Sequence, residues 1–321
     1  MRICPASLRG KTVKDQDCVQ FLQWSLPKLK MHWKGFRKVR GQICKRIERR
    51  MRELGMLDVF SYRTYLEENP AEWSLLGSLY AVTISRFYRD QAVFQFLERE
   101  VIPKLAAAAA AEGSKELAFW SIGCASGEEP YTLALLWDLS VGHCFPEVKT
   151  RIIATEINRK MIERARSGCY PYSSVRGLPD EWLAKAFIRR GDEYCIRREE
   201  LEKVMFLEQD VRMSTAEGMY HLILCRNIVF TYFEDGLQRE IVERIRSRLF
   251  PGGALVIGVH ESLPSGAEGF APWSGKLGVY LSIPRDKNAG DNGENGKHNT
   301  AAAETEMEQR HKALKYKPDS E

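Results

Sequence analysis

Two glycines and two adjacent glutamates mark the point where one apolar run ends and another begins. The stretch FWSIGCASGEEPYTLALLW, residues 119–137, places Gly123 and Gly127 after the first run and Glu128 and Glu129 ahead of the second. Glycine allows a positive φ or a close backbone approach, and a glycine-rich turn after the first strand of a doubly wound sheet is where nucleotide-like ligands bind. The spacing is neither the dinucleotide pattern G-x-G-x-x-G nor that of a P-loop.

The two glutamates restrict the ligand that this turn can hold. A pyrophosphate would approach the start of the following helix, where the carboxylates of Glu128 and Glu129 would repel it. We therefore expect a ligand that is neutral or cationic at this point. S-adenosylmethionine meets that requirement, because it carries a sulfonium and an ammonium group and no phosphate. The alternative is that the acids only complement the helix dipole, which is worth about 0.3–1 kcal/mol.

Polar residues also end three later apolar runs and extend the predicted site. Glu156 lies at the tip of TRIIATEI, where a carboxylate can accept hydrogen bonds from both ribose hydroxyls of an adenosine. Asp210 and Val211 end MFLEQDV, where the acid could accept a hydrogen bond from the adenine amino group. Cys225 and Arg226 end LILCRN at the same edge of the sheet, although Arg226 could equally cap its strand.

These residues need a parallel sheet to bring them together, and the sequence predicts one. From residue 117 onward, short apolar runs alternate with helical stripes, whereas the preceding segments all have helical periodicity. We expect an α/β fold in which an all-helical N-terminal domain precedes a Rossmann-like, doubly wound domain. The predicted boundaries are a helical domain at 1–105, a linker at 106–116, the α/β domain at 117–285 and a disordered tail at 286–321.

One helix of the N-terminal domain is strongly basic. Between Lys28 and Arg52 the chain carries eleven lysines and arginines against one acid, Glu48. Apolar residues recur every three or four positions in the same stretch, which predicts a helix over 37–52 with one apolar stripe and a cationic exterior. This surface is either a docking site for an acidic partner or a solvated face.

Composition limits the class of protein. The chain has 321 residues, of which 44% are hydrophobic and 28% are charged, as in soluble globular proteins with a sizeable core. No apolar run is long enough to span a membrane and no secretory signal is present, so we predict a cytoplasmic protein without membrane insertion. The eight cysteines never form C-x-x-C, which favours reduced thiols over disulfides and predicts no metal site.

Several motifs, taken in order, resemble one family. GCASGEEPYTLAL, ATEI, RARSGCYPYSSVRGLP, FLEQDV, LILCRNIVFTYF and RLFPGGALVIGVHESL look like those of the CheR-type chemotaxis receptor methyltransferases, and VTISRFYRD is similar to that family's block ending Phe-Phe-Arg-Glu. The resemblance covers residues 37–283. It implies an S-adenosylmethionine-dependent protein-glutamate O-methyltransferase, which forms methyl esters on the cytoplasmic helices of chemoreceptors.

The resemblance also implies roles for individual positions. Thr83, Ser85 and Arg89 fall where the family lines the donor and acceptor site from the helical domain. Glu129, Glu156, Asp210, Val211, Cys225 and Arg226 fall on donor-binding positions, to which our own reasoning adds Gly123. The family usually has Asn at position 83, Thr at 85 and Asp at 156. Because this chain has one extra residue after Asn227, the family's active-site tyrosine position could correspond to Thr231 or to Tyr232, and we assign it to Tyr232. The predicted catalytic residues are thus Arg89 and Tyr232.

The implied reaction needs placement more than proton transfer. A glutamate side chain is already ionised at pH 7 and attacks a methyl group without a general base. Arg89 could orient this acceptor carboxylate or bind the carboxylate of the donor. The basic helix 37–52 would dock an acidic helical substrate, so reversing the charges of Arg46, Arg49 and Arg50 should raise its KM and leave donor affinity unchanged.

Other interpretations stay open at this point. The chain could methylate another protein or a small molecule, or it could sense the donor or its demethylated product without turnover. We expect a monomer that does not bind nucleic acid, because the basic stretch lacks interleaved aromatic residues beyond Trp33 and Phe36.

Overall fold

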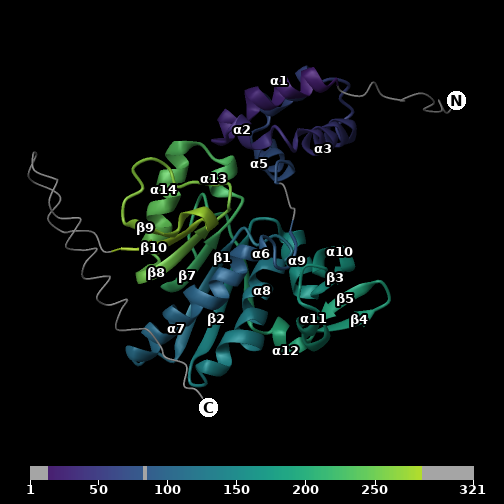
Figure 1. Cartoon of the computed structure of the whole chain (residues 1–321). Coiled ribbons are helices and arrows are strands. Elements are labelled where there is room, and N and C mark those ends of the chain that lie inside the picture. The colour runs from purple at the N-terminus through teal and green to yellow at the C-terminus, as the bar shows by residue number, and fades with distance from the viewer. Residues whose placement is uncertain (1–13, 82–84, 284–321) are drawn as a thin grey trace, which may run out of the picture. The chain divides into compact units, whose positions relative to one another are not determined.

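The computed structural model describes residues 14–81 and 85–283, and up to residue 80 its elements are helices. Buried apolar side chains between Cys18 and Tyr80 form a separate hydrophobic core. Ile43, Ile47 and Met51, which form the predicted apolar stripe, belong to this core. The basic helix begins at Arg40 rather than at residue 37. The elements of this helical unit are α1 (Asp15–Ser25), η1 (Pro27–Leu29), α2 (Trp33–Phe36), α3 (Arg40–Glu53), α4 (Val59–Glu68) and α5 (Pro70–Leu79) (Figure 1).

A buried carboxylate joins three of these helices. Glu72 on α5 is 7% exposed and accepts hydrogen bonds from Arg50 Nε and Nη2 on α3, both at 2.9 Å. The Tyr62 hydroxyl on α4 donates to the same carboxylate at 2.9 Å. The hydrogen bonds from Arg50 hold the pKa of Glu72 below its usual value. Arg50 is therefore a structural residue, because its removal would leave a buried charge unpaired.

A second arginine of α3 also holds the helical unit together. Arg46 is half-buried, and its Nη1 donates to the backbone oxygens of Leu79, at 3.0 Å, and Ala81. These carbonyls lie at the end of α5, where helical hydrogen bonds run out. Arg46 and Arg50, which the sequence analysis placed among the docking cations, are thus engaged within the helical unit.

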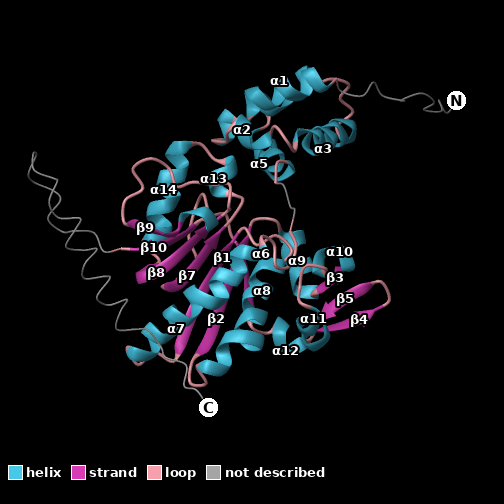
Figure 2. Ribbon diagram, in the orientation of Figure 1, coloured by secondary structure: helices cyan, strands magenta, loops and turns pink. Residues whose placement is uncertain are grey.

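The predicted doubly wound sheet is confirmed. Its seven strands have the order β6-β2-β1-β7-β8-β10-β9, with parallel pairing from β6 to β8 and antiparallel pairing of β10 with β8 and β9. The order reverses direction at β1, and in open α/β sheets ligands bind at such a switch point. The strands are β1 (Glu116–Ile122), β2 (Lys149–Glu156), β6 (Val204–Glu208), β7 (Tyr220–Cys225), β8 (Leu249–Ile257), β9 (Phe270–Ser274) and β10 (Val279–Ser282) (Figure 2).

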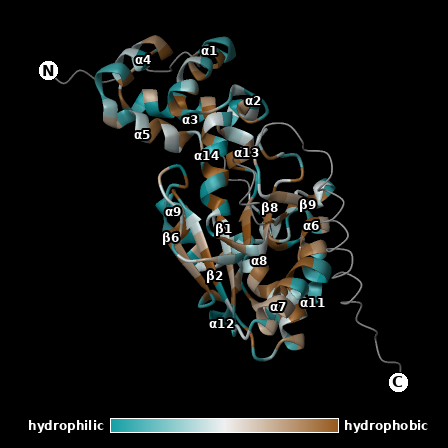
Figure 3. Ribbon diagram, turned by 90° about the vertical axis from the view of Figure 1, so that its left-hand side faces the viewer, coloured by the Kyte–Doolittle hydropathy of each residue, from teal (hydrophilic) through white to brown (hydrophobic). Residues whose placement is uncertain are grey.

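Side chains on this sheet alternate between two cores. On β1, Leu117 and Phe119 belong to the core shared with α7 and α8, whereas Ala118, Trp120 and Ile122 belong to the core shared with α13 and α14. Both faces are thus covered, and the middle strands are correspondingly apolar (Figure 3). The covering helices and turns are α6 (Gln91–Phe96), η2 (Leu97–Val101), α7 (Ile102–Ala111), α8 (Glu128–Leu136), η3 (Trp137–Val141), η4 (Gly142–Cys144), α9 (Arg159–Ser167), α13 (Val229–Tyr232) and α14 (Asp235–Arg246).

Residues 87–109 pack with the sheet rather than with the N-terminal helices. Phe94, Leu105 and Ala109 belong to the core that contains β1 and β2. The segment predicted as a linker, 106–116, continues α7 to Ala111 and starts β1 at Glu116. We therefore propose that the boundary between the two domains lies near residue 81 instead of 105. The predicted tail at 286–321 lies outside the described residues.

A small second sheet is inserted between β2 and β6. Its strands β3 (Cys169–Pro171), β5 (Glu193–Ile196) and β4 (Phe187–Arg190) pair antiparallel in the order β3-β5-β4. The short helices α10 (Tyr172–Val175), α11 (Asp180–Ala186) and α12 (Arg198–Leu201) belong to the same insertion, and η5 (Gly275–Leu277) completes the described elements. None of the described helices could cross a membrane.

The prediction that the cysteines are reduced is wrong for four of them. Cys18 on α1 is bonded to Cys44 on α3, and Cys169 on β3 is bonded to Cys195 on β5. Each pair is 26 residues apart in the sequence and meets only because helices pack or strands pair in register. The remaining described cysteines, Cys124, Cys144 and Cys225, are free thiols.

Candidate functional site

A cleft lies at the carboxyl ends of β1, β2, β6 and β7. Its open volume is about 1230 Å³, including space open to solvent. Thr83 lies outside the described residues, and Cys225 is fully buried in the sheet core and does not line the cleft. The remaining sequence-predicted residues all line it: Ser85, Arg89, Gly123, Glu129, Glu156, Asp210, Val211, Arg226 and Tyr232.

The glycine turn after β1 uses its amides within the chain. Gly123 has a φ of 69°, and a Cβ there would lie 2.6 Å from the Ile228 side chain. The amides of Gly123 and Cys124 both donate to Thr155 O, at 2.8 and 3.1 Å. A phosphate-binding loop instead points its amides at the ligand. Gly123 is thus required because Ile228 packs against it, and these two amides are not available to a phosphate.

Glu156 ends β2 as a buried carboxylate. It is 6% exposed and accepts hydrogen bonds from the backbone amides of Asn158, at 2.9 Å, and Ala125, at 3.0 Å. Burial raises the pKa of Glu156 above the usual 4.5 and outweighs these hydrogen bonds. No basic side chain among the described residues forms an ion pair with it, so its remaining lone pairs suit neutral donors such as hydroxyls.

The residues after β6 offer a second acceptor beside the predicted Asp210. The Asp210 carboxylate is occupied by Arg212, which donates from its amide at 2.9 Å and from Nη2 at 2.7 Å. The neighbouring Gln209 also lines the cleft, and its Oε1 is buried without a hydrogen-bond partner. Sequence reasoning missed Gln209, because a glutamine beside an acid carries no signal of its own.

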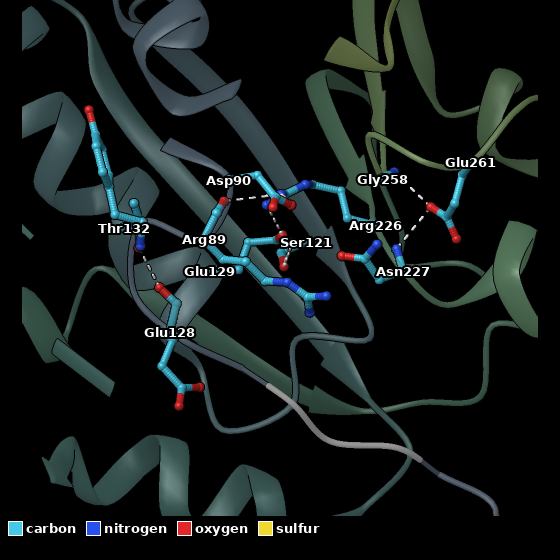
Figure 4. Close-up of polar contacts among 11 residues, drawn as sticks. Arg89, Asp90, Ser121, Glu128, Glu129, Thr132, Arg226, Asn227, Gly258 and Glu261 are labelled. Atoms are coloured by element: carbon cyan, nitrogen blue, oxygen red, sulfur yellow. Dashed lines mark hydrogen bonds and ion pairs between the residues drawn. The ribbon is translucent and has the colours of Figure 1, made fainter. Parts of the chain in front are cut away.

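Arg226 is the centre of the polar contacts in the cleft (Figure 4). Its side chain is 2% exposed, with Nη1 3.0 Å from Glu129 Oε2 and Nη2 2.6 Å from Asp90 Oδ2. Nη2 also donates to the backbone oxygen of Arg89 at 3.1 Å, and the guanidinium lies over the Phe94 ring. Arg226 therefore ties the end of β7 to the start of α8 and to residues 89–90. Asp90 was not anticipated.

Both carboxylate oxygens of Glu129 accept hydrogen bonds. Its second carboxylate oxygen accepts a hydrogen bond from the Ser121 hydroxyl at 2.8 Å, opposite Arg226. Its side chain keeps 17% exposure toward the cleft that it lines. The neighbouring Glu128 is 1% exposed and accepts from the Ser126 hydroxyl, so it belongs to the interior.

The structure separates Thr231 from Tyr232. The Thr231 hydroxyl donates to Glu261. The other carboxylate oxygen of Glu261 accepts from the amides of Asn227, at 2.9 Å, and Gly258, at 2.6 Å (Figure 4). Tyr232 lines the cleft, and burial raises the pKa of its hydroxyl, although nearby Arg89 acts in the opposite direction. Tyr232 is thus the residue of the two that a ligand can reach. Glu261 is a further residue that the sequence did not predict.

Backbone hydrogen bonds and a ring contact attach the helical unit to the segment that carries Tyr232. The His32 amide donates to Tyr232 O at 2.8 Å, the Glu234 amide donates to Lys30 O at 3.0 Å, and the rings of Phe36 and Tyr232 lie 4.8 Å apart. A Cβ added to Gly35 would lie 2.2 Å from the backbone oxygen of Thr231. This contact therefore requires glycine, and sequence periodicity alone does not predict it.

The comparison with protein families matches residues 83–278 to the family described as CheR methyltransferase, SAM binding domain. The chain belongs to the CheR family. The match covers most of the cleft lining and the strands around it, so the CheR domain binds S-adenosylmethionine. The described residues offer no group of three or more metal-ligating side chains there.

Curated relatives agree with this assignment. The chain is 32% identical over 192 residues to the chemotaxis protein methyltransferase of Listeria innocua, covering 60% of this chain and 70% of the relative. It is 28% identical over 231 residues to the Escherichia coli protein of the same name, and the alignment covers 70% of this chain and 77% of the relative. It is 29% identical over 243 residues to an uncharacterised 104.1 kDa protein of Rhodobacter capsulatus, covering 76% of this chain but only 25% of that protein's length.

The residues of the cleft fit this donor. Arg226 Nε and Gln209 Oε1 are a buried donor and a buried acceptor without partners, and both residues line the cleft. A bound ligand with hydrogen-bonding groups of both kinds would satisfy them. Glu156 adds a carboxylate without a counter-ion, and the glycine turn leaves few amides for phosphate. S-adenosylmethionine supplies an electrophilic methyl group, and the CheR cleft provides acceptors, donors and room.

Glu156→Gln should weaken donor binding. One carboxylate oxygen becomes an amide nitrogen that cannot accept, so we expect an affinity about 10- to 100-fold lower by titration calorimetry. Because the pKa of Glu156 is raised, wild-type affinity should also fall as pH decreases toward 4.5 and the carboxyl protonates, while the variant shows a flatter pH profile.

Glu208→Gln is the matched control, since Glu208 pairs in register with Glu156 one strand away and is exposed. Its donor affinity should equal that of the wild type. Equal binding by Glu156→Gln and wild type would remove Glu156 from the donor site.

Gly35→Ala should disturb the placement of Tyr232. The added Cβ must displace the Thr231 carbonyl, so we expect lower thermal stability and a methyl-transfer kcat reduced at least about tenfold, with donor affinity unchanged. Gly41→Ala is the control, because a Cβ at this exposed position of α3 meets nothing within 4 Å and should stabilise the helix by about 0.5–1 kcal/mol. A wild-type kcat in Gly35→Ala would show that the contact does not position Tyr232.

Proposed function

We propose that this protein transfers the methyl group of S-adenosylmethionine to the side-chain carboxylate of a glutamate, in an acidic helical protein such as a chemoreceptor. The observation that carries the proposal is the presence of Arg89 and Tyr232 in the lining of the donor cleft. A guanidinium and a phenol both donate hydrogen bonds, as the binding of a carboxylate requires. The Listeria and Escherichia coli relatives are named chemotaxis protein methyltransferases, which supports an acceptor that belongs to chemotaxis.

The chain's own residues would act by placement. Arg89 would hold the acceptor carboxylate, and Tyr232 would fix its direction of approach, so that attack on the methyl group is in line. An ionised glutamate needs no base. The apolar lining, which includes Phe36, Phe94 and Ile228, would keep water from stabilising the separate charges of the reactants.

The chemistry of the methylated product tests the proposed function. The purified protein, a radiolabelled methyl donor and a cell extract should give protein-bound label that is released by mild base, and mass spectrometry should place it on glutamate. Arg89→Ala should abolish the label, while Arg99→Ala, an exposed arginine outside the cleft, should retain it. Base-stable label on lysine, arginine or a metabolite would identify another acceptor, and donor binding without any label would identify a sensor.

We further propose that α3 docks the acidic substrate through the cations that the fold leaves exposed. Arg46 and Arg50 are unsuitable probes, because they hold the helical unit together. The exposed cations of the helix are Arg40, Lys45, Arg49 and Arg52, and the last three are the probes because Arg40 already pairs with Asp15 on α1.

Reversal of all three charges, by Lys45→Glu, Arg49→Glu and Arg52→Glu together, should raise the KM for the acidic protein at least about tenfold and leave kcat and donor affinity unchanged. Lys149→Glu, Lys160→Glu and Arg239→Glu together form a control of equal charge change at exposed positions outside the helical unit. A similar rise in both triple variants would indicate a general effect of net charge and contradict docking on α3.

A further inference from the structure

One carboxylate holds the loop that carries Tyr232 at the end of β7. Glu261 lies on the connection between β8 and β9, and its Oε2 accepts hydrogen bonds from the amides of Asn227, at 2.9 Å, and Gly258, at 2.6 Å (Figure 4). Its Oε1 accepts a hydrogen bond from the Thr231 hydroxyl. A single side chain thus joins the start of the loop, the end of the loop and the end of β8.

The backbone of this loop depends on such support. Asn227 has a φ of 57°, in the left-handed region that residues with a side chain seldom adopt and that persists where surrounding contacts hold it. The end of β8 also comes very close, because a Cβ at Gly258 would lie 2.4 Å from Asn227 Nδ2 and 2.8 Å from Glu261 Oε2. Glu261 therefore fixes a tightly packed turn rather than an open surface loop.

Thr231 and Tyr232 are neighbours that face different surroundings. The Thr231 hydroxyl is engaged by Glu261, whereas Tyr232 lines the donor cleft. Both belong to the single turn α13, in which consecutive side chains point about 100° apart. A fixed direction for Thr231 therefore fixes the direction in which Tyr232 points. The bond to Glu261 also separates the two candidates for the tyrosine position that the sequence left open.

We propose that Glu261 is a positioning residue for methyl transfer, which acts through Thr231 on the direction of Tyr232. The proposal rests on the function proposed above, in which Tyr232 directs the acceptor, and adds the residue that directs Tyr232. Glu261 is absent from the described lining of the cleft, so it acts on the reactants only through other residues. Because attack on the methyl group must be in line, a small rotation of α13 lowers kcat more than it lowers substrate binding.

Steady-state kinetics of substituted proteins test this role. Thr231→Val removes the hydroxyl and keeps the branched shape, so kcat should fall about tenfold, while the KM for the acceptor and the donor affinity stay within about twofold. Thr231→Ser keeps the hydroxyl and should keep the wild-type kcat. Glu261→Gln should keep it as well, because the amide oxygen can accept from both backbone amides and the amide nitrogen can donate to the Thr231 hydroxyl.

A double-mutant cycle shows whether the effect passes through Tyr232. In a Tyr232→Phe background, Thr231→Val should change kcat by less than about twofold, because the hydroxyl that it misplaces is already absent. A loss as large in this background as in the wild type would overturn the proposal. So would a wild-type kcat in Thr231→Val, or equal losses in Thr231→Val and Thr231→Ser.

Hydrogen exchange tests the loop without methyl transfer. In Glu261→Ala the amides of residues 227–232 should exchange faster than in the wild type, because Asn227 loses its acceptor, and Glu261→Gln should exchange as the wild type does. Glu268→Ala is the matched control, since Glu268 is an exposed acid of the same connection, and it should change neither exchange nor kcat. Wild-type exchange in Glu261→Ala would overturn the proposal, whereas the expected exchange in a protein that labels no glutamate would contradict the proposed function alone.

Discussion

The arrangement of the cleft depends on one buried guanidinium. Arg226 pairs with Asp90 and Glu129 while it is 2% exposed, so its charge is compensated by two acids from distant parts of the chain. An unpaired charge at this depth would cost several kcal/mol, and the loss of any partner would therefore be felt by the others. Arg226 thereby fixes residues 89–90 relative to β7 and α8. The position of Arg89, on which acceptor binding depends in our proposal, follows from this contact.

The cleft contains a buried carboxylate without a cationic partner among the described residues, and this restricts the ligands that the cleft can bind. Glu156 is buried without a basic partner among the described residues, and its pKa is raised as a result. The amides of the glycine turn donate to Thr155 O instead of pointing at a ligand. A site with buried carboxylates and occupied amides rejects phosphate and accepts hydroxyl groups and cations. The preference for S-adenosylmethionine over a dinucleotide thus depends on the occupied backbone amides as well as on the buried carboxylate.

Local sequence predicted the parts of the structure that depend on local interactions. Strand periodicity and the glycine turn located β1, β2, β6 and β7, and with them the residues at their carboxyl ends. Several of the missed features join distant segments, whereas Gln209 was missed because its residue type carries no signal. The partners of Arg50, the disulfide between Cys18 and Cys44, and the bond from Thr231 to Glu261 each depend on packing that no short window contains. Cys225, a motif position next to Arg226, is buried in the sheet core, so its role in donor binding stays a prediction.

The contact between the helical unit and residues 231–234 would link the substrate docking that we propose on α3 to the chemistry in the cleft. The backbone of His32 and the Cα of Gly35 fix the segment of Tyr232, and α3, with its exposed cations, belongs to the same hydrophobic core as Phe36. In our proposal, a partner bound to α3 would therefore act on the packed unit that holds Tyr232. Because packed cores shift as wholes rather than deform locally, a displacement of α3 reaches the cleft through Phe36 and Gly35. The same packed helical unit would thus position both the acceptor and Tyr232.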